Sequence, residues 1–383
     1  MAQSGPLNGL TIVDLSRILA GPYCTLLLAE LGARVIKVET PGGGDDARQY
    51  GPFTNGKSTY FASVNRGKES IALDLKAPAD KEIFERLLDK ADAIVENFRP
   101  GTMERLGYGW EQLHPRYPRL IYAAASGFGH TGPFSHHPSY DMVVQGLGGI
   151  MSITGVPDGP LVRIGTSIGD LAGGLYTTIA LNAAFLHRER TGEATKVDVA
   201  LFDCQLALLE NAIMRYTTTG EIPGPLGARH PSITPFEAFA TKDGHIIIAA
   251  GNDGLWVKLT EALDHPDLAQ NPNYKTNPLR NQHQPQLKSE IEAILSTHTT
   301  EHWLAVLEEA GIPGGQVNNV KQALAHPQTE ARNMLIEVDD PTTGPLKFAG
   351  NPMKLSAFPD PSTRTPAPDL DADRAKILRE LGM

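Results

Sequence analysis

Apolar strands that alternate with helices over the first 125 residues constrain the fold more than any other feature. Because strand and helix segments in this order form parallel pairs through right-handed crossovers, they predict an α/β fold with a doubly wound parallel sheet. Short apolar runs with β-branched residues predict strands at residues 10–15, 34–39, 70–75, 93–98 and 120–125. Helical spacing of apolar residues predicts helices at 24–31, 79–91 and 103–113.

Beyond residue 126 the pattern changes. Residues 127–165 are rich in Gly, Pro, Ser and His and are expected to form an ordered loop region with one short helix at 142–150. A helix at 169–188 and a strand at 197–201 follow, and a further helix is expected to reach about residue 216.

A second, smaller α+β domain is predicted after a linker rich in Gly, Pro and Thr. The expected division is a large domain over 1–216, the linker and small domain over 217–325, and a C-terminal part, 326–383, that returns to the large domain. The small domain is expected to contain a hairpin at 236–250 and helices at 255–263, 284–296 and 301–310. A last helix is expected at 372–381.

Composition excludes several classes of function. The formal net charge is -10 and the pI is about 5.6, which argues against nucleic acid or an anionic membrane as the main partner. No apolar run approaches the roughly 18 residues that span a bilayer, and the N-terminus lacks signal-peptide features, so a cytoplasmic protein is expected. Two cysteines, Cys24 and Cys204, cannot form a disulfide framework or a cysteine-only zinc site.

No metal site or permanently bound cofactor is expected. His130, His136 and His137 lie in a loop rich in Gly and Pro without metal-binding spacing, so a solvated loop is favoured over a metal site. The glycine motifs of P-loop proteins and serine hydrolases do not occur.

Two glycine turns allow more than one interpretation. Gly21-Pro22 precedes a helix whose free N–H groups could bind an anion, although the pair also serves simply to start helices. Residues 42–46 (GGGDD) have the flexibility of a phosphate loop, but their acidic residues would repel phosphate, so a mobile turn is expected.

Asp170 lies among glycines at the predicted start of a helix, within residues 165–174 (GTSIGDLAGG). Its carboxylate could cap the helix by accepting hydrogen bonds from first-turn N–H groups. Alternatively, the positive end of the helix dipole could keep it ionised as a nucleophile, with glycines allowing close approach of a bulky ligand. Tyr140-Asp141 is equally open to a packing or a functional interpretation.

Taken together, these segments resemble the class III CoA-transferases, the family that includes formyl-CoA transferase and the carnitine CoA-transferases. The order and spacing of the matching motifs extend over nearly the whole chain. The motifs are LSRILAGP at 15–22, GARVIKVE at 32–39, ENFRPG at 96–101, SGFGHTGP at 126–133, SYD at 139–141 and GD at 169–170.

The resemblance implies an interlocked, ring-like homodimer in which Asp170 attacks an acyl-CoA thioester and forms an anhydride and then an aspartyl–CoA thioester. CoA and acyl-CoA would be substrates, and Arg17, Lys76 and Arg105 would supply positive charge for CoA phosphates. The implied CoA-binding residues are Arg17, Ile18, Leu19, Ala20, Leu73, Lys76, Asn97, Phe98, Arg99, Arg105 and Tyr140.

Two departures from formyl-CoA transferases bear on the substrate. Those enzymes carry Gln where this chain has Leu19, and a glycine-rich loop where it has residues 227–231 (GARHP). Stretches 96–106, 126–133 and 332–337 resemble members that use oxalate. We therefore expect acetyl-CoA or formyl-CoA as donor and oxalate as acceptor.

The sequence is also compatible with two alternatives. One is a succinyl-CoA-dependent dicarboxylate CoA-transferase. The other is a 2-methylacyl-CoA racemase, but racemases of this family carry His where Tyr140 stands. A tyrosine with a pKa near 10 is a poor acid or base at neutral pH, which disfavours the racemase.

Overall fold

The structure is a computed structural model that describes residues 5–383. The chain forms two compact units. The first comprises the chain up to Met151 together with Arg163–Ile222 and Pro327–Met383, and the second comprises Ser152–Val162 and Pro223–His326. The domain boundaries expected from the sequence stay a prediction.

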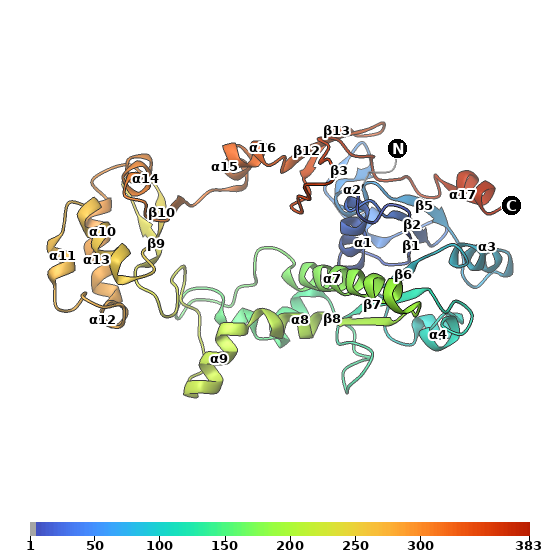
Figure 1. The fold of residues 1–383 in the computed structure, drawn as a ribbon, viewed down its shortest axis with the longest axis horizontal. Coiled ribbons are helices and arrows are strands. Elements are labelled where there is room, and N and C mark those ends of the chain that lie inside the picture. Colours follow the sequence, from blue (N-terminus) through green and yellow to red (C-terminus); the bar gives the residue numbers. More distant parts are fainter. Residues whose placement is uncertain (1–4) are drawn as a thin grey trace. The chain divides into compact units, whose positions relative to one another are not determined.

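A six-stranded, fully parallel sheet organises the first unit, as the alternating pattern predicts (Figure 1). Its order is β5-β2-β1-β6-β7-β8. From β1 the chain adds β2 and β5 on one side, and it then returns to add β6, β7 and β8 on the other side. This reversal creates a topological switch point between β1 and β6. The strands are β1 (Thr11–Asp14), β2 (Arg34–Glu39), β5 (Glu69–Ala72), β6 (Ala93–Glu96), β7 (Ile121–Ser126) and β8 (Lys196–Ala200).

Helices cover both faces of this sheet because successive strand side chains point to opposite sides. Ile12 belongs to a buried cluster with Cys24 of α1 (Ala20–Glu30) and Leu181 of α7 (Ile168–Thr191). Val13, the next residue, belongs to a second cluster with Phe84 of α3 (Pro78–Leu88). The doubly wound α/β fold is thus confirmed.

The C-terminal segment packs on the free edge of β5. Asp371 and Asp373 accept hydrogen bonds from the backbone N–H groups of Ala72 and Ser70, and Ile377 of α17 (Arg374–Glu380) enters the core. The smaller elements of the first unit are η1 (Asp46–Gln49), β3 (Phe53–Thr54), β4 (Lys57–Ser58), α2 (Thr59–Asn65), α6 (Asp141–Leu147), η2 (Ile150–Ile153, in part), α16 (Pro327–Ala331), β12 (Leu335–Asp340) and β13 (Gly344–Ala349).

Two predicted helices are interrupted in the structure. The helix expected at 103–113 is two short helices, α4 (Thr102–Leu106) and α5 (Trp110–Leu113), because Gly107 adopts φ +89° and ends the first. The helix expected after residue 201 divides at Leu209 into α8 (Leu201–Leu208) and α9 (Glu210–Thr219).

The second unit packs helices on a three-stranded antiparallel sheet of order β11-β10-β9. Its strands are β9 (Phe236–Ala240), β10 (His245–Ala249) and β11 (Gly314–Gln316), and its helices are α10 (Asp253–Ala262), α11 (Asp267–Gln270), α12 (Asn277–Gln282), α13 (Gln284–Leu295), α14 (Thr300–Glu309) and α15 (Val320–Leu324). Among residues 5–383, no helix combines the length and apolarity needed to cross a bilayer.

Candidate active site

Two loops meet at the switch point of the parallel sheet, where open α/β folds bind ligands. One follows β1 and the other follows β6, and these two strands are neighbours. The backbone N–H of Arg17 donates to Asn97 Oδ1 (2.8 Å), and Asn97 Nδ2 donates back to the carbonyl of Arg17 (2.7 Å). The Arg17 guanidinium also lies 5.2 Å from the ring centre of Phe98.

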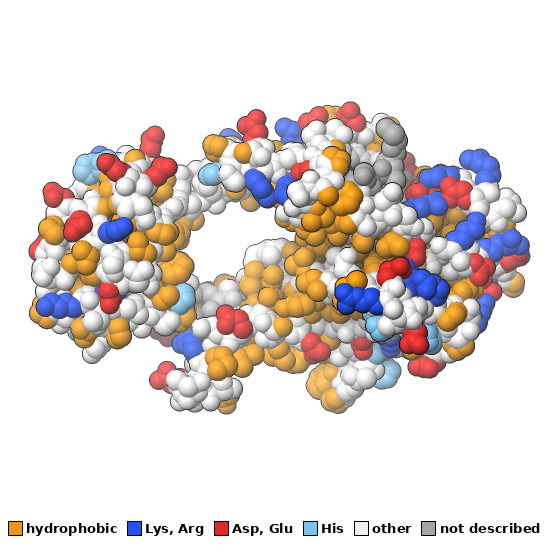
Figure 2. All heavy atoms as spheres, in the orientation of Figure 1, with side chains coloured by type: hydrophobic (Ala, Val, Ile, Leu, Met, Phe, Trp, Pro, Cys, Tyr) orange, Lys and Arg blue, Asp and Glu red, His pale blue; other side chains and the backbone are white. Residues whose placement is uncertain are grey.

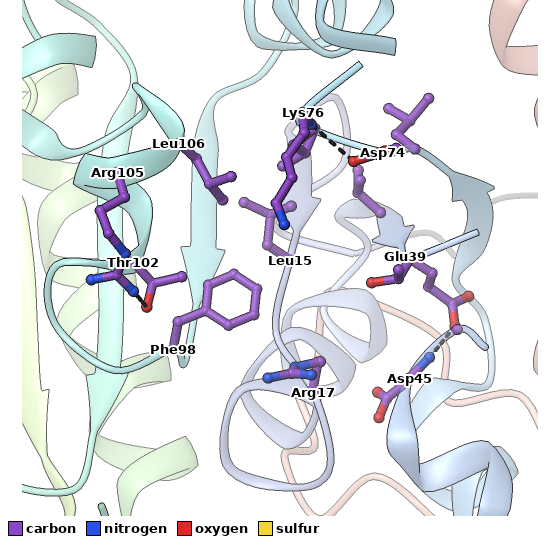
Figure 3. Close-up of a pocket in the computed structure, with 15 residues that line it drawn as sticks. Leu15, Arg17, Glu39, Asp45, Asp74, Lys76, Phe98, Thr102, Arg105 and Leu106 are labelled. Carbon is purple, nitrogen blue, oxygen red and sulfur yellow. Dashed lines mark hydrogen bonds between the residues drawn. The ribbon is translucent and has the colours of Figure 1, made fainter. Parts of the chain in front are cut away.

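A cavity of about 760 Å³, here called the outer cavity, opens beside these loops (Figure 3). Leu73 and Phe98 contribute apolar walls, and Arg17, Lys76 and Arg105 bring three positive charges. The Arg17 guanidinium makes one long ion pair with Asp46 (3.3 Å) in which both side chains are about half exposed. Such an exposed pair is weak, so the guanidinium is available to an anionic ligand.

A smaller cavity of about 220 Å³, here called the inner cavity, shares Arg17 and Phe98 with the outer one. Every residue implied by the family resemblance lines one of the two cavities, so the structure brings the whole set together. Their role in CoA binding stays a prediction. Those that line the inner cavity are Arg17, Ile18, Leu19, Ala20, Asn97, Phe98, Arg99, Tyr140 and Asp170.

Asp170 is the third residue of α7 and does not cap it. The N-cap residue is Ser167, and within residues 5–383 no hydrogen bond to the Asp170 carboxylate contributes to its pKa. Asp141, the first residue of α6, satisfies the start of α7 instead, because its Oδ1 accepts the N–H of Gly169 (2.8 Å). The capping interpretation of Asp170 is therefore wrong.

The environment of Asp170 disfavours negative charge. Burial, and next the nearby negative charge of Asp141, raise the pKa of Asp170 from 3.8 to about 7. Burial therefore outweighs the positive end of the helix dipole, which the sequence suggested could keep this carboxylate ionised. In turn, burial and then the charge of Asp170 raise the pKa of Tyr60 to about 12. A site of this kind stabilises any neutral form of Asp170, whether protonated or acylated.

Asp45 is a site residue that sequence reasoning missed. The acidic turn at 42–46 was expected to be mobile, yet Asp45 is buried and lies 2.9 Å from the ammonium group of Lys37. Its Oδ1 accepts the backbone N–H groups of Ile18 (3.0 Å) and Ala47 (2.9 Å). One signal was present in the sequence, since a lysine inside an apolar strand needs a buried carboxylate partner.

The environments of His130 and Gly21 differ from those expected from the sequence. The side chain of His130 is buried rather than solvated, with Nδ1 3.1 Å from Lys196 Nζ. Gly21 has a packing role, because a Cβ there would lie 2.2 Å from Ser16 Cβ. Among residues 5–383, no group of three or more His, Cys, Asp or Glu side chains is arranged to hold a metal ion.

Comparisons with known proteins agree with this geometry. The family model described as CoA-transferase family III matches residues 7–374. The acetyl-CoA:oxalate CoA-transferase of Acetobacter aceti is 46% identical over 98% of this chain and 96% of that protein. The human succinyl-CoA:glutarate CoA-transferase is 38% identical over 98% of this chain and 86% of that protein.

A solved structure leads to the same family. The crystal structure of a CAIB/BAIF family protein from Brucella suis is 39% identical, with a TM-score of 0.87 over 99% of this chain and 100% of that one. With a match across nearly its whole length and relatives of this similarity, the chain belongs to CoA-transferase family III.

Proposed function

We propose that this class III CoA-transferase moves CoA through covalent intermediates on Asp170. The Asp170 carboxylate attacks the thioester carbonyl of the donor, the C–S bond breaks, and CoA leaves as a thiolate. The thiolate attacks the Asp170 carbonyl of the anhydride, which releases the donor acid and leaves an aspartyl–CoA thioester. The acceptor carboxylate attacks the carbonyl of this thioester, the C–S bond breaks, and CoA leaves again as a thiolate from a second mixed anhydride between Asp170 and the acceptor. The thiolate then attacks the acceptor carbonyl of that anhydride, which frees the Asp170 carboxylate and gives the new acyl-CoA.

The environment of Asp170 carries this proposal. Burial and the charge of Asp141 raise its pKa to about 7, so the folded protein favours the neutral form of this group. Both the anhydride and the thioester on Asp170 are neutral, whereas the attacking carboxylate is charged. The same two causes therefore stabilise the covalent intermediates relative to the resting anion, and a higher pKa also makes the carboxylate a better nucleophile.

The two cavities support a division of the CoA molecule between them. The outer cavity holds Arg17, Lys76 and Arg105 beside apolar walls, which suits phosphates and a nucleoside base. The inner cavity contains Asp170 and suits the thioester end. Since Arg17 lines both cavities, it would lie along the path between the two ends of the ligand.

For the substrates we favour acetyl-CoA or formyl-CoA as donor and oxalate as acceptor. The relative that is 46% identical, an acetyl-CoA:oxalate CoA-transferase, supports this choice. The inner cavity of about 220 Å³ is smaller than the roughly 300–1,000 Å³ of drug-sized ligand sites, which suits a short acyl group. Succinyl-CoA with a longer dicarboxylate is the second candidate, because relatives 38–41% identical carry such names.

Direct transfer assays test this proposal. The protein is incubated with acetyl-, formyl- or succinyl-CoA and with oxalate, glutarate or mesaconate, and the new thioesters are identified by mass. We expect oxalyl-CoA to form fastest, and Asp170→Asn to abolish its formation. If the new thioester forms faster from glutarate or mesaconate than from oxalate, the second candidate, a longer dicarboxylate as acceptor, replaces the first. Deuterium entering a 2-methylacyl-CoA from heavy water would instead indicate a racemase.

We also propose an intertwined homodimer. Ile179 and Leu186 of α7 and Met214 and Tyr216 of α9 are each more than half exposed, and hydrophobic side chains gather over α7 in Figure 2. Apolar helix faces of this extent typically become buried between subunits. Light scattering should give twice the chain mass of 41.3 kDa, whereas a monomer at micromolar concentration would contradict the proposal.

A further inference from the structure

The loop after β1 contains a strained residue at the boundary of the two cavities. Ile18 adopts φ +69°, in the left-handed region that β-branched residues almost never occupy. Backbone strain of this kind persists only where the surroundings determine the conformation, and it is common at binding and catalytic sites. Ile18 lies in the chain between Arg17, which lines both cavities, and Leu19, which lines the inner one.

Side chains from three other segments hold the backbone of this loop. Asn97 pairs with both the N–H and the carbonyl of Arg17. The Lys37 ammonium donates to the carbonyl of Ser16 (2.7 Å). The N–H of Ile18 itself donates to Asp45 Oδ1 (3.0 Å).

Asp45 is suited to act as the anchor at Ile18 because it is itself fixed. Its side chain is fully buried, its Oδ2 lies 2.9 Å from Lys37 Nζ, and its backbone N–H donates to Glu39 Oε2 (2.9 Å). Lys37 therefore links Asp45 to the carbonyl of Ser16, so one buried ion pair holds the loop from both sides of Arg17.

We propose that Asp45 is a positioning residue, which holds Ile18 in its left-handed conformation so that the loop presents Arg17 to CoA and Leu19 and Ala20 to the reacting thioester. This inference rests on the proposed function. It predicts that the importance of Asp45 depends on the residue at position 18, because glycine adopts a positive φ without help.

A double-mutant cycle between positions 45 and 18 tests this dependence. The variants are Asp45→Ala, Ile18→Gly and the double mutant. For each, the dissociation constant of CoA is measured by calorimetry, and the rate of Asp170 acylation by acetyl-CoA is measured in single turnovers. We expect Asp45→Ala to weaken CoA binding and to slow acylation of Asp170. The factor by which it does so should be about tenfold smaller when residue 18 is glycine than when it is isoleucine.

Asp340 supplies a matched control. It is also buried, pairs with Lys57 (2.6 Å) and accepts two backbone N–H groups, those of Thr342 (2.9 Å) and Thr343 (3.2 Å). It lies at the turn between β12 and β13 and lines neither the outer nor the inner cavity. Asp340→Ala should lower the Tm but leave CoA binding and acylation unchanged.

If Asp45→Ala lowers CoA affinity and the acylation rate by the same factor with isoleucine and with glycine at position 18, the positioning role is overturned. It is also overturned if Asp340→Ala weakens CoA binding as much as Asp45→Ala does. If Asp45→Ala does not fold, Asp45→Asn replaces it in the cycle. The asparagine side chain is a weaker hydrogen-bond acceptor than aspartate. Asp45→Asn should therefore still lower CoA affinity and the acylation rate, by a factor about threefold smaller when residue 18 is glycine. A wild-type protein that neither binds CoA nor becomes acylated would contradict the proposed function instead, so the two failures are distinguishable.

Discussion

Replacing Asp170 by asparagine should stabilise the folded protein, and the gain should grow as the pH rises. The pKa of Asp170 is about 7 in the folded protein and 3.8 in a free chain, so between about pH 4 and 7 the folded state keeps a proton that the unfolded chain has lost. Wild-type stability therefore falls as the pH rises through this window. Asparagine has no proton to lose and escapes this penalty.

The magnitude follows from the pKa shift. A rise from 3.8 to about 7 corresponds to roughly 4 kcal/mol, and because Asp170 is only partly buried we expect solvent screening to reduce this to about 2 kcal/mol. In a chain of 383 residues that gain raises the Tm by about 2–3 °C.

Thermal unfolding at pH 5 and pH 8 provides the assay. The Tm of Asp170→Asn should exceed that of the wild type by a larger margin at pH 8 than at pH 5. Asp203→Asn is the matched control, because Asp203 is an exposed aspartate that also lies in the first turn of a helix, α8. An Asp170→Asn gain that is equal at the two pH values, or a loss of stability at pH 8, would refute the reasoning.

Three further predictions concern other parts of the chain. Burial and then the charge of Asp141 raise the pKa of Asp170, and Asp141→Asn removes only the charge, so the pH at which acylation reaches half its maximal rate should be lower than in the wild type in a pH–rate profile. Gly174→Ala should lower stability by about 1–3 kcal/mol in urea unfolding, because its Cβ would lie 2.7 Å from a carbonyl at the start of α1. Gly146→Ala, whose Cβ would meet no atom closer than 3.9 Å, should be neutral or stabilising. Arg280→Ala should destabilise the second unit by roughly 3 kcal/mol in the same assay, because two buried carbonyls lose their donor; an unchanged urea midpoint would contradict this.

The sheet could be predicted from the sequence because parallel strands are buried on both faces and appear as continuous apolar runs. The predicted strand at 34–39 coincides with β2, and the others shift by at most a few residues. Helix interruptions were harder to predict. One glycine such as Gly107 is tolerated inside many helices, and only tertiary packing decides whether it ends one.

The candidate site was predictable only where a local motif marked it. Asp170 and the loops containing Arg17 and Asn97 lie in recognisable segments. Asp45 does not lie in such a segment, since a carboxylate after three glycines is typical of a solvated turn. The burial of Asp45 depends on its ion pair with Lys37, which lies in a separate strand. The raised pKa of Asp170 depends first on its burial and then on a second carboxylate, Asp141, 29 positions earlier in the chain, and no local pattern predicts either of them.

The central claim, that Asp170 carries the acyl group and then CoA, is tested most directly by chemical trapping. The protein is treated with hydroxylamine with and without acetyl-CoA, and its peptides are mapped by mass. A hydroxamate should form on Asp170, within residues 164–176, only when acetyl-CoA is present, because a resting carboxylate does not react with hydroxylamine. A hydroxamate on Asp141 or Asp203 instead, or none while a thioester is demonstrably turned over, would contradict the claim.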